Sequence, residues 1–184
     1  MPEKQILTHV CCGPCSTYVT TQLKAEGFSV TGYYFNPNIY PPEEYAKRRE
    51  VAQEYFKDEG MVFIEGEYDT QKYYSCLGGV TEIGKRCREC YWLRLSETAL
   101  KASEMRIPFF TTTLLISPYQ NQAVLREIGK RLADKYNLVF YEEDFTKGYQ
   151  ESRKIARERD MYRQKYCGCE YSLRESAEKK AASL

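Results

Sequence analysis

The sequence predicts an α/β fold built on a doubly wound, mostly parallel sheet. Short apolar runs alternate with longer amphipathic segments, and Gly, Pro and Asn residues separate them. Such alternation is typical of a parallel sheet covered by helices on both faces, with right-handed crossovers. The chain has 184 residues, 42% hydrophobic and 29% charged, as expected of a globular protein. We therefore expect one Rossmann-like domain over residues 1–184.

The first part of the chain contains three predicted strands separated by two helices. The strands are expected at residues 5–10, 28–35 and 61–64, and the helices at 16–26 and 42–58. Ser16 is the expected N-cap of the first helix, because it follows Pro14. Asn36-Pro37-Asn38 is expected to end the second strand, and Gly60 the second helix.

The second part continues the alternation and then adds helices. Helices are expected at 69–77, 88–105 and 118–136, and strands at 108–115 and 138–141. Two further helices are expected at 149–162 and 171–182, separated by a Cys167-Gly168-Cys169 turn. We expect this C-terminal segment, from about residue 147 to 184, to complete a cysteine site. Its excess of basic residues fits either a phosphate contact or a solvated helix face.

The eight cysteines are unevenly distributed. The three groups are Cys11-Cys12-Gly13-Pro14-Cys15, Cys87-Arg88-Glu89-Cys90 and Cys167-Gly168-Cys169, and Cys76 stands alone. No apolar run has the length of a membrane span and no signal peptide is evident, so we expect a cytoplasmic protein without a membrane partner. In a reducing cytosol, grouped thiols are more often metal ligands or catalytic groups than a disulfide framework.

The first cysteine group occupies a position suited to chemistry. It follows the first strand directly, and ligands bind at the carboxyl ends of strands in doubly wound sheets. The start of the next helix also stabilises thiolates there. His9 lies two residues before Cys11, so both side chains face the same side of the strand. His9 is expected to be either a ligand or proton donor, or a packed, hydrogen-bonded core residue.

Spacing alone leaves three kinds of chemistry open. The seven grouped sulfurs exceed the four that a structural zinc ion or a four-iron cluster uses. The surplus sulfurs therefore point to a second metal, an open-site ligand or a redox disulfide. Cys12-Gly13-Pro14-Cys15 also matches the thioredoxin motif, which favours thiol–disulfide exchange. Iron–sulfur, zinc and disulfide chemistry all remain consistent with the residues.

Several ordered motifs extend over nearly the whole chain. They are His9 to Ser16, Tyr34 to Ile39, Arg86 to Leu95, Phe110 to Leu114 with Ser117-Pro118-Tyr119, and Met161 to Ser172. Together they resemble the epoxyqueuosine reductase family of the QueH type. The resemblance implies a fold like the nucleotide-binding domains of the PP-loop ATPase (HUP) group. Cysteines replace a PP-loop phosphate signature after the first strand, so ATP use is not expected.

The resemblance also implies an activity and cofactors. The reaction would be the two-electron reductive removal of the epoxide oxygen of epoxyqueuosine at the tRNA wobble position, the last step of queuosine biosynthesis. The cofactors would be a [4Fe–4S] cluster and a second metal ion, expected to be iron, supplied with electrons by an unidentified donor. We expect Cys87, Cys90 and one or both of Cys167 and Cys169 to hold the cluster. Cys11 and Cys12 would also reach it, and together with Cys15 would bridge to the second metal; these three cysteines and His9 are the expected catalytic residues.

Polar residues at the same sheet edge are the expected substrate contacts. These candidates are Asn36, Asn38, Thr112, Ser117 and Tyr119, with Arg163 beside the third cysteine group directed at the anticodon backbone. Tyr162 and Tyr166 are candidates for stacking on an unpaired base. A simple turn at Asn36-Pro37-Asn38 and a solvated helix end around Arg163 are the alternatives.

Overall fold

The computed structural model describes residues 4–182, and its five strands form one sheet in the order β3-β2-β1-β4-β5. The strands are β1 (Lys4–His9), β2 (Phe28–Tyr34), β3 (Val62–Glu65), β4 (Phe109–Thr112) and β5 (Val139–Phe140). All four strand pairs are parallel. The chain winds outward from β1 to β3 and then returns to place β4 on the other side of β1. The predicted doubly wound class is therefore confirmed.

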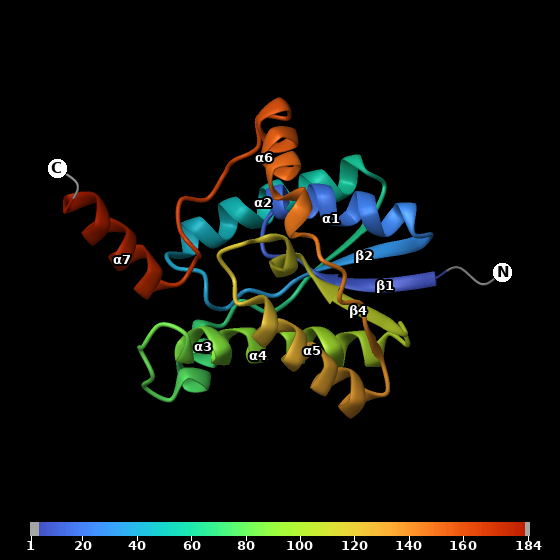
Figure 1. The fold of residues 1–184 in the computed structure, drawn as a ribbon, viewed down its shortest axis with the longest axis horizontal. Coiled ribbons are helices and arrows are strands. Elements are labelled where there is room, and N and C mark those ends of the chain that lie inside the picture. Colours follow the sequence, from blue (N-terminus) through green and yellow to red (C-terminus); the bar gives the residue numbers. More distant parts are fainter. Residues whose placement is uncertain (1–3, 183–184) are drawn as a thin grey trace.

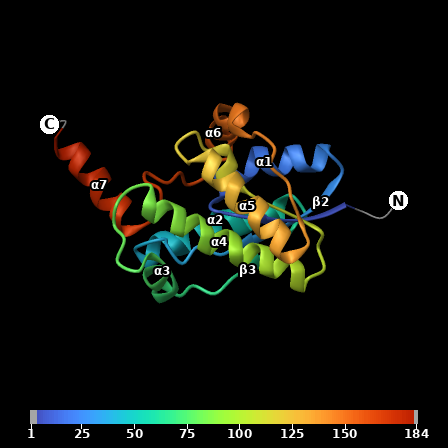
Figure 2. The ribbon, with the colours of Figure 1, turned by 60° about the horizontal axis from the view of Figure 1, so that its bottom comes forward.

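Helices cover both faces of the sheet (Figure 1). On one face lie α1 (Gly13–Ala25), α2 (Pro42–Asp58) and α6 (Tyr149–Glu158). On the other lie α3 (Thr70–Leu77), α4 (Lys85–Glu104) and α5 (Gln122–Tyr136), and Figure 2 shows α4 and α5 side by side. The last helix, α7 (Glu170–Ala181), projects from one end of the molecule and buries no side chain completely. None of the helices within residues 4–182 has the length and apolar character that crossing a membrane requires.

Some element boundaries differ from those predicted, and side-chain caps explain the differences. Helix α1 begins at Gly13 because the Cys12 side chain, rather than Ser16, accepts a hydrogen bond from a free amide of the first turn. The predicted strand at 108–115 ends at Thr112, whose hydroxyl accepts from the Leu114 amide and starts a short 3-10 helix, η1 (Thr113–Ile116). Helix α5 begins at Gln122, after an Asn121 cap, rather than at residue 118.

The strand order creates a switch point between β1 and β4. The connections leaving these two adjacent strands go to opposite faces of the sheet, so a crevice opens at their carboxyl ends. Cys11 and Cys12 follow β1 at this edge, and η1 follows β4. A second 3-10 helix, η2 (Thr146–Gly148), leads into α6.

Candidate metal centre

Cys11, Cys12 and Cys15 form a compact group of thiols at the switch point. Their three sulfur atoms all lie within 4.8 Å of one another. Cys12 is buried, caps α1 and accepts from the Cys15 amide at 3.4 Å. Thr113 donates its hydroxyl to the Cys11 sulfur at 3.2 Å and accepts from the Cys11 amide at 3.0 Å, which fixes this residue against η1.

The three thiols share negative charge unequally. Hydrogen bonds from the Cys12 and Cys15 thiols hold the pKa of Cys11 well below its usual range, with a further contribution from Thr113. Burial raises the pKa of Cys12, and the hydrogen bonds with Cys11 and Cys12 raise that of Cys15. Within the group, Cys11 is therefore the residue whose thiolate form is most favoured. Metal ions bind thiolates, so metal ligation by all three would release protons.

A second group of four cysteines surrounds a small cavity of about 20 Å³. Cys87 and Cys90 come from successive turns of α4, Cys169 caps α7, and Cys167 precedes it in the loop. Cys90 and Cys169 are buried, whereas Cys167 is exposed. Burial raises the pKa of Cys90 to about 12. The buried Oδ1 atom of Asn38, whose residue lines the same cavity, has no protein partner.

The two groups adjoin each other. A larger cavity of about 350 Å³ is lined by Cys11 and Cys15 on one side and by Cys167 and Gln120 on the other. Cys167 and Gln120 also line the small cavity, and the Gln120 amide lies 3.7 Å from the Cys167 sulfur. The fold thus brings all seven grouped cysteines to one edge of the sheet, where six of them line two neighbouring cavities and Cys12 lies beside Cys11 and Cys15.

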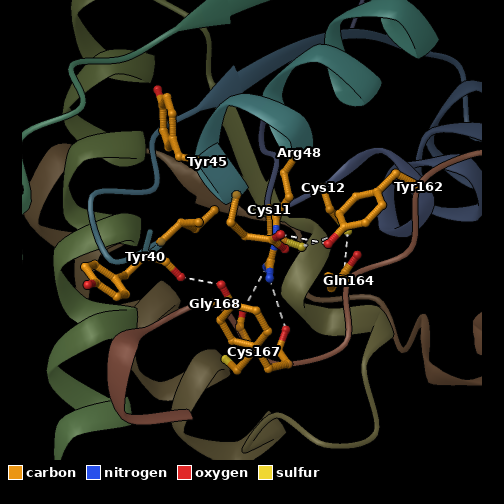
Figure 3. A network of polar contacts seen from close by, with 12 residues as sticks. Cys11, Cys12, Tyr40, Tyr45, Arg48, Tyr162, Gln164, Cys167 and Gly168 are labelled. Atoms are coloured by element: carbon orange, nitrogen blue, oxygen red, sulfur yellow. Dashed lines mark hydrogen bonds and ion pairs between the residues drawn. The ribbon is translucent and has the colours of Figure 1, made fainter. Parts of the chain in front are cut away.

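Arg48 of α2 anchors the loop that carries Cys167 and Cys169 (Figure 3). Its guanidinium is almost completely buried, pairs with Glu44 at 2.7 Å, and donates to the carbonyls of Cys167 at 3.0 Å and Tyr166 at 3.1 Å. The Gly168 carbonyl accepts from the Tyr40 amide at 2.8 Å. These bonds fix the backbone on both sides of Cys167 against the body of the protein.

Gly168 and Gln164 complete the attachment of this loop. Gly168 has a φ of +138°, and a Cβ atom there would lie 3.2 Å from the Arg48 guanidinium, so the position requires glycine. The Gln164 amide donates to the Cys12 sulfur at 3.1 Å. The loop therefore closes over Cys11, Cys12 and Cys15. It also contributes Cys167 and Cys169 to the group of four cysteines.

His9 is held inside the protein rather than at the cavity. Its Nδ1 atom lies 2.9 Å from the Thr112 hydroxyl, and its Nε2 atom lies 3.2 Å from the Phe35 carbonyl. A carbonyl can only accept, so Nε2 carries the proton and Nδ1 accepts from Thr112. Burial lowers the pKa of His9 to about 4, which keeps the ring neutral. Because both nitrogens have protein partners, this arrangement favours the packed alternative over the ligand.

The expected substrate contacts divide into inner and outer residues. Asn36 is fully buried and donates to the Val10 carbonyl at 2.8 Å, and Thr112 is buried against His9. Ser117 and Tyr119 line the 350 Å³ cavity, and 79% of Tyr119 is exposed. Arg163 lies in an adjoining groove that also includes Cys15.

The two tyrosines expected to stack on a base have protein partners instead. The Tyr162 hydroxyl donates to Glu44 at 2.7 Å, and the Lys47 ammonium lies 4.4 Å from the centre of its ring. The Tyr166 hydroxyl donates to the Tyr40 carbonyl, and Arg48 lies over its ring. Both therefore help to attach the loop. The exposed aromatic residue at the large cavity is Tyr119, which meets Tyr149 edge to face at 5.9 Å.

All eight cysteines are free thiols, so the possibility of a redox disulfide receives no support from the structure.

Several other residues of the centre could not be identified from the sequence. These are Arg48, Arg94, Gln120 and Gln164. Only Arg94 carried a local signal, because it lies one helical turn after Cys90.

The fold and the site define a doubly wound α/β protein with a thiol-rich centre, compatible with metal binding, at its ligand-binding edge. The family model described as "Epoxyqueuosine reductase QueH" matches residues 6–175. This chain belongs to the epoxyqueuosine reductase QueH family.

Curated relatives agree with this assignment, and one solved structure has a similar fold. The protein named epoxyqueuosine reductase QueH from Thermotoga maritima is 36% identical over 96% of this chain and 94% of its own length. The protein of that name from Streptococcus pyogenes serotype M1 is 36% identical over 92% of this chain and 70% of its own length. A predicted subunit of tRNA methyltransferase from Methanocaldococcus jannaschii has a TM-score of 0.58 at 16% identity and covers 83% of this chain and 76% of its own. At this identity the likeness concerns the fold alone.

Proposed function

We propose that this protein is an epoxyqueuosine reductase that removes the epoxide oxygen from epoxyqueuosine in tRNA. The observation that carries the proposal is the meeting of seven thiols at the switch point, six of which line two adjoining cavities. Family membership supports the identity of the substrate. The reaction consumes two electrons and two protons, and it releases water while the two epoxide carbons become an alkene.

The proposed cofactors are a [4Fe–4S] cluster and a second metal ion, iron. Cys87, Cys90, Cys167 and Cys169 would hold the cluster, because four thiols around one cavity are the ligand set that such a cluster requires. Structural zinc sites also use four cysteines. The 20 Å³ cavity has room for about one water. A cluster therefore needs the space that continues past Cys167 and Gln120.

The second metal ion would bind to Cys11, Cys12 and Cys15. Their sulfurs are close enough together to share one ion, and the lowered pKa of Cys11 favours the thiolate form that binds metal. When bound, the cluster supplies electrons one at a time, and the ion polarises the epoxide oxygen. Thr113 and Gln164 hold the Cys11 and Cys12 sulfurs in place by hydrogen bonds.

The 350 Å³ cavity is the proposed pocket for the modified base. Its polar lining includes Ser117, Tyr149 and Lys165, so ionisable groups face a substrate placed there. Tyr119 at the rim is exposed and offers an aromatic surface for an unpaired base of the anticodon loop. Arg163 and Arg153 line the adjoining groove, where cationic side chains suit the RNA backbone.

The cellular setting follows from this chemistry. The electron donor is a separate reducing partner, and the enzyme acts in the cytoplasm, where tRNA is modified.

The C-terminal segment from about residue 147 belongs to the same α/β domain, because α6 packs on α1 and Arg48 anchors the loop that follows.

The test combines metal analysis with turnover. Protein purified without air is expected to contain iron and sulfide, and to convert epoxyqueuosine-containing tRNA to the queuosine form with a strong chemical reductant. Cys90→Ser and Cys11→Ser are expected to lose activity by at least 100-fold. Cys76→Ser is the matched control and should retain both iron and activity, because Cys76 lies outside both groups.

Two other outcomes would reject the proposal. A colourless protein that binds zinc when isolated without air, and that leaves epoxyqueuosine intact, would indicate a zinc-stabilised tRNA-binding domain. Reduction of a disulfide substrate that depends on Cys12 and Cys15 but not on Cys87 or Cys169 would indicate a thioredoxin-like activity.

A further inference from the structure

Three buried arginines surround the seven sulfurs, and they differ in their charge partners. Arg48, Arg86 and Arg94 are only 2%, 4% and 2% exposed. Arg48 pairs with Glu44, and Arg86 pairs with Glu175, each at 2.7 Å. Within residues 4–182, no aspartate or glutamate pairs with Arg94.

The contacts of Arg94 direct its charge at the cysteines. Its Nε atom donates to the Cys90 carbonyl at 3.3 Å, and its Nη2 atom is buried without any protein partner. The side chain lines the 20 Å³ cavity. Cys90 and Cys167 line the same cavity, so their sulfurs, once a bound metal group deprotonates them, are a source of negative charge beside Arg94.

A buried guanidinium without an anion is strongly unfavourable. Arginine does not lose its proton in proteins, so it cannot avoid the penalty by becoming neutral. The charge must therefore be balanced by nearby anions, as buried charges are in stable proteins. At this cavity the thiols and the group that they bind are the available source of negative charge.

We propose that Arg94 is the buried counter-charge of the group formed by Cys87, Cys90, Cys167 and Cys169, and that it raises the reduction potential of the iron–sulfur group bound there. The proposal rests on the iron–sulfur part of the proposed function. Reduction adds one negative charge to the group. A fixed positive charge in a medium of low dielectric constant favours that more negative state.

The experiment compares variants of the iron-loaded protein without any RNA. Midpoint potentials are measured by an EPR-monitored redox titration of the wild type, Arg94→Met, Arg94→Gln and Arg94→Lys. Both neutral variants are expected to shift to more negative potentials by about 59 mV, which corresponds to a tenfold change in the one-electron equilibrium. Arg94→Lys keeps the charge, so its midpoint potential should lie at least halfway from that of the neutral variants to that of the wild type.

A matched control removes a charge from the same helix away from the sulfurs. Lys101 lies in α4 and pairs with Glu104 at the surface. Lys101→Gln should leave the midpoint potential unchanged. A second measurement uses the metal-free proteins, in which Arg94→Met should melt at the same temperature as the wild type or higher, because a poorly compensated buried charge has been removed.

Three results would overturn the role of Arg94. These are neutral variants with unchanged potentials, a Lys variant that shifts as far as the neutral ones, and neutral variants that fail to fold without metal. The last result would assign Arg94 to the fold. Wild-type protein that takes up zinc and no iron would reject this proposal and the iron–sulfur centre together. Failure to convert epoxyqueuosine, with the potential shifts intact, would reject only the proposed substrate.

Discussion

His9, the single histidine of the chain, is kept neutral by its surroundings. Burial lowers its pKa from 6.5 to about 4. In the unfolded chain the ring takes up a proton below pH 6.5, whereas in the folded protein it does so only near pH 4. The unfolded state therefore binds more protons between these values. The contribution of His9 to the unfolding free energy is therefore fully present above pH 6.5 and is lost as the pH falls toward 4.

We expect the metal-free protein to lose about 3 kcal/mol of unfolding free energy through His9 between pH 7 and pH 4. The measurement is chemical denaturation at a series of pH values, compared with His9→Gln. The carboxylates titrate in both proteins, so the difference between them isolates the ring. Curves that stay parallel over this range would contradict the inference that His9 is buried as a neutral group.

Arg48 is expected to stabilise both the fold and the cysteine loop. Arg48→Met removes the donors to Cys167 and Tyr166 and leaves Glu44 without its partner, so we expect a loss of about 3 kcal/mol. Arg48→Lys keeps the charge but loses the bidentate geometry of the guanidinium. Its unfolding free energy should therefore lie between those of the wild type and Arg48→Met. Both losses are measured by chemical denaturation, and iron content by direct analysis.

The neighbouring arginine provides the control for Arg48. Arg49 is partly exposed and pairs with Glu65 at 3.4 Å. Arg49→Gln should change the unfolding free energy by no more than about 0.5 kcal/mol and leave the iron content intact. If Arg48→Met behaved like Arg49→Gln, the loop would not depend on this anchor.

At the scale of elements, two cysteines serve as helix caps. Cys12 caps α1 and Cys169 caps α7, each by accepting an amide hydrogen bond with its sulfur. The existence of these helices could be predicted from the spacing of apolar residues. Their first residues could not, because cysteine is not a favoured cap and Ser16 is. The position of Cys12 at a helix start depends on the thiol being held by its neighbours.

Cys12 variants should therefore separate capping from metal binding. Serine is a good cap, so Cys12→Ser should leave the stability of the metal-free protein within about 0.5 kcal/mol, whereas Cys12→Ala should lose about 1 kcal/mol. Both should lose the metal ion of the first group, measured as iron per protein. A Cys12→Ser protein that retained its full iron content would show that Cys12 is a cap only.

At the scale of the whole molecule, the location of the candidate metal centre could be predicted from the sequence better than the set of residues that form it. Cys11, Cys12 and Cys15 follow the first strand, so their position at the sheet edge follows from local order. Arg48 and Cys167 are separated by 119 residues, and Gln164 and Cys12 by 152. No periodic pattern connects such residues, so only the folded chain reveals that they meet.

The same long-range contacts imply that metal binding orders the C-terminal segment. Helix α7 buries no side chain completely, and Cys169 at its start faces Cys87 and Cys90 of α4 across the small cavity. A metal group held by these cysteines would connect the helix to the body with bonds far stronger than its present contacts. Binding energy of this kind appears as stability of the bound state.

Removal of the metal is therefore expected to act locally. Hydrogen exchange in residues 165–176 should quicken at least tenfold in the metal-free protein, while β1 and β4 change little because their amides are paired within the sheet. The control is Cys76→Ser, which should show the same difference between its loaded and metal-free forms. Equal loss of protection throughout the sheet would instead mean that the metal supports the entire fold, since exchange would then occur through global unfolding.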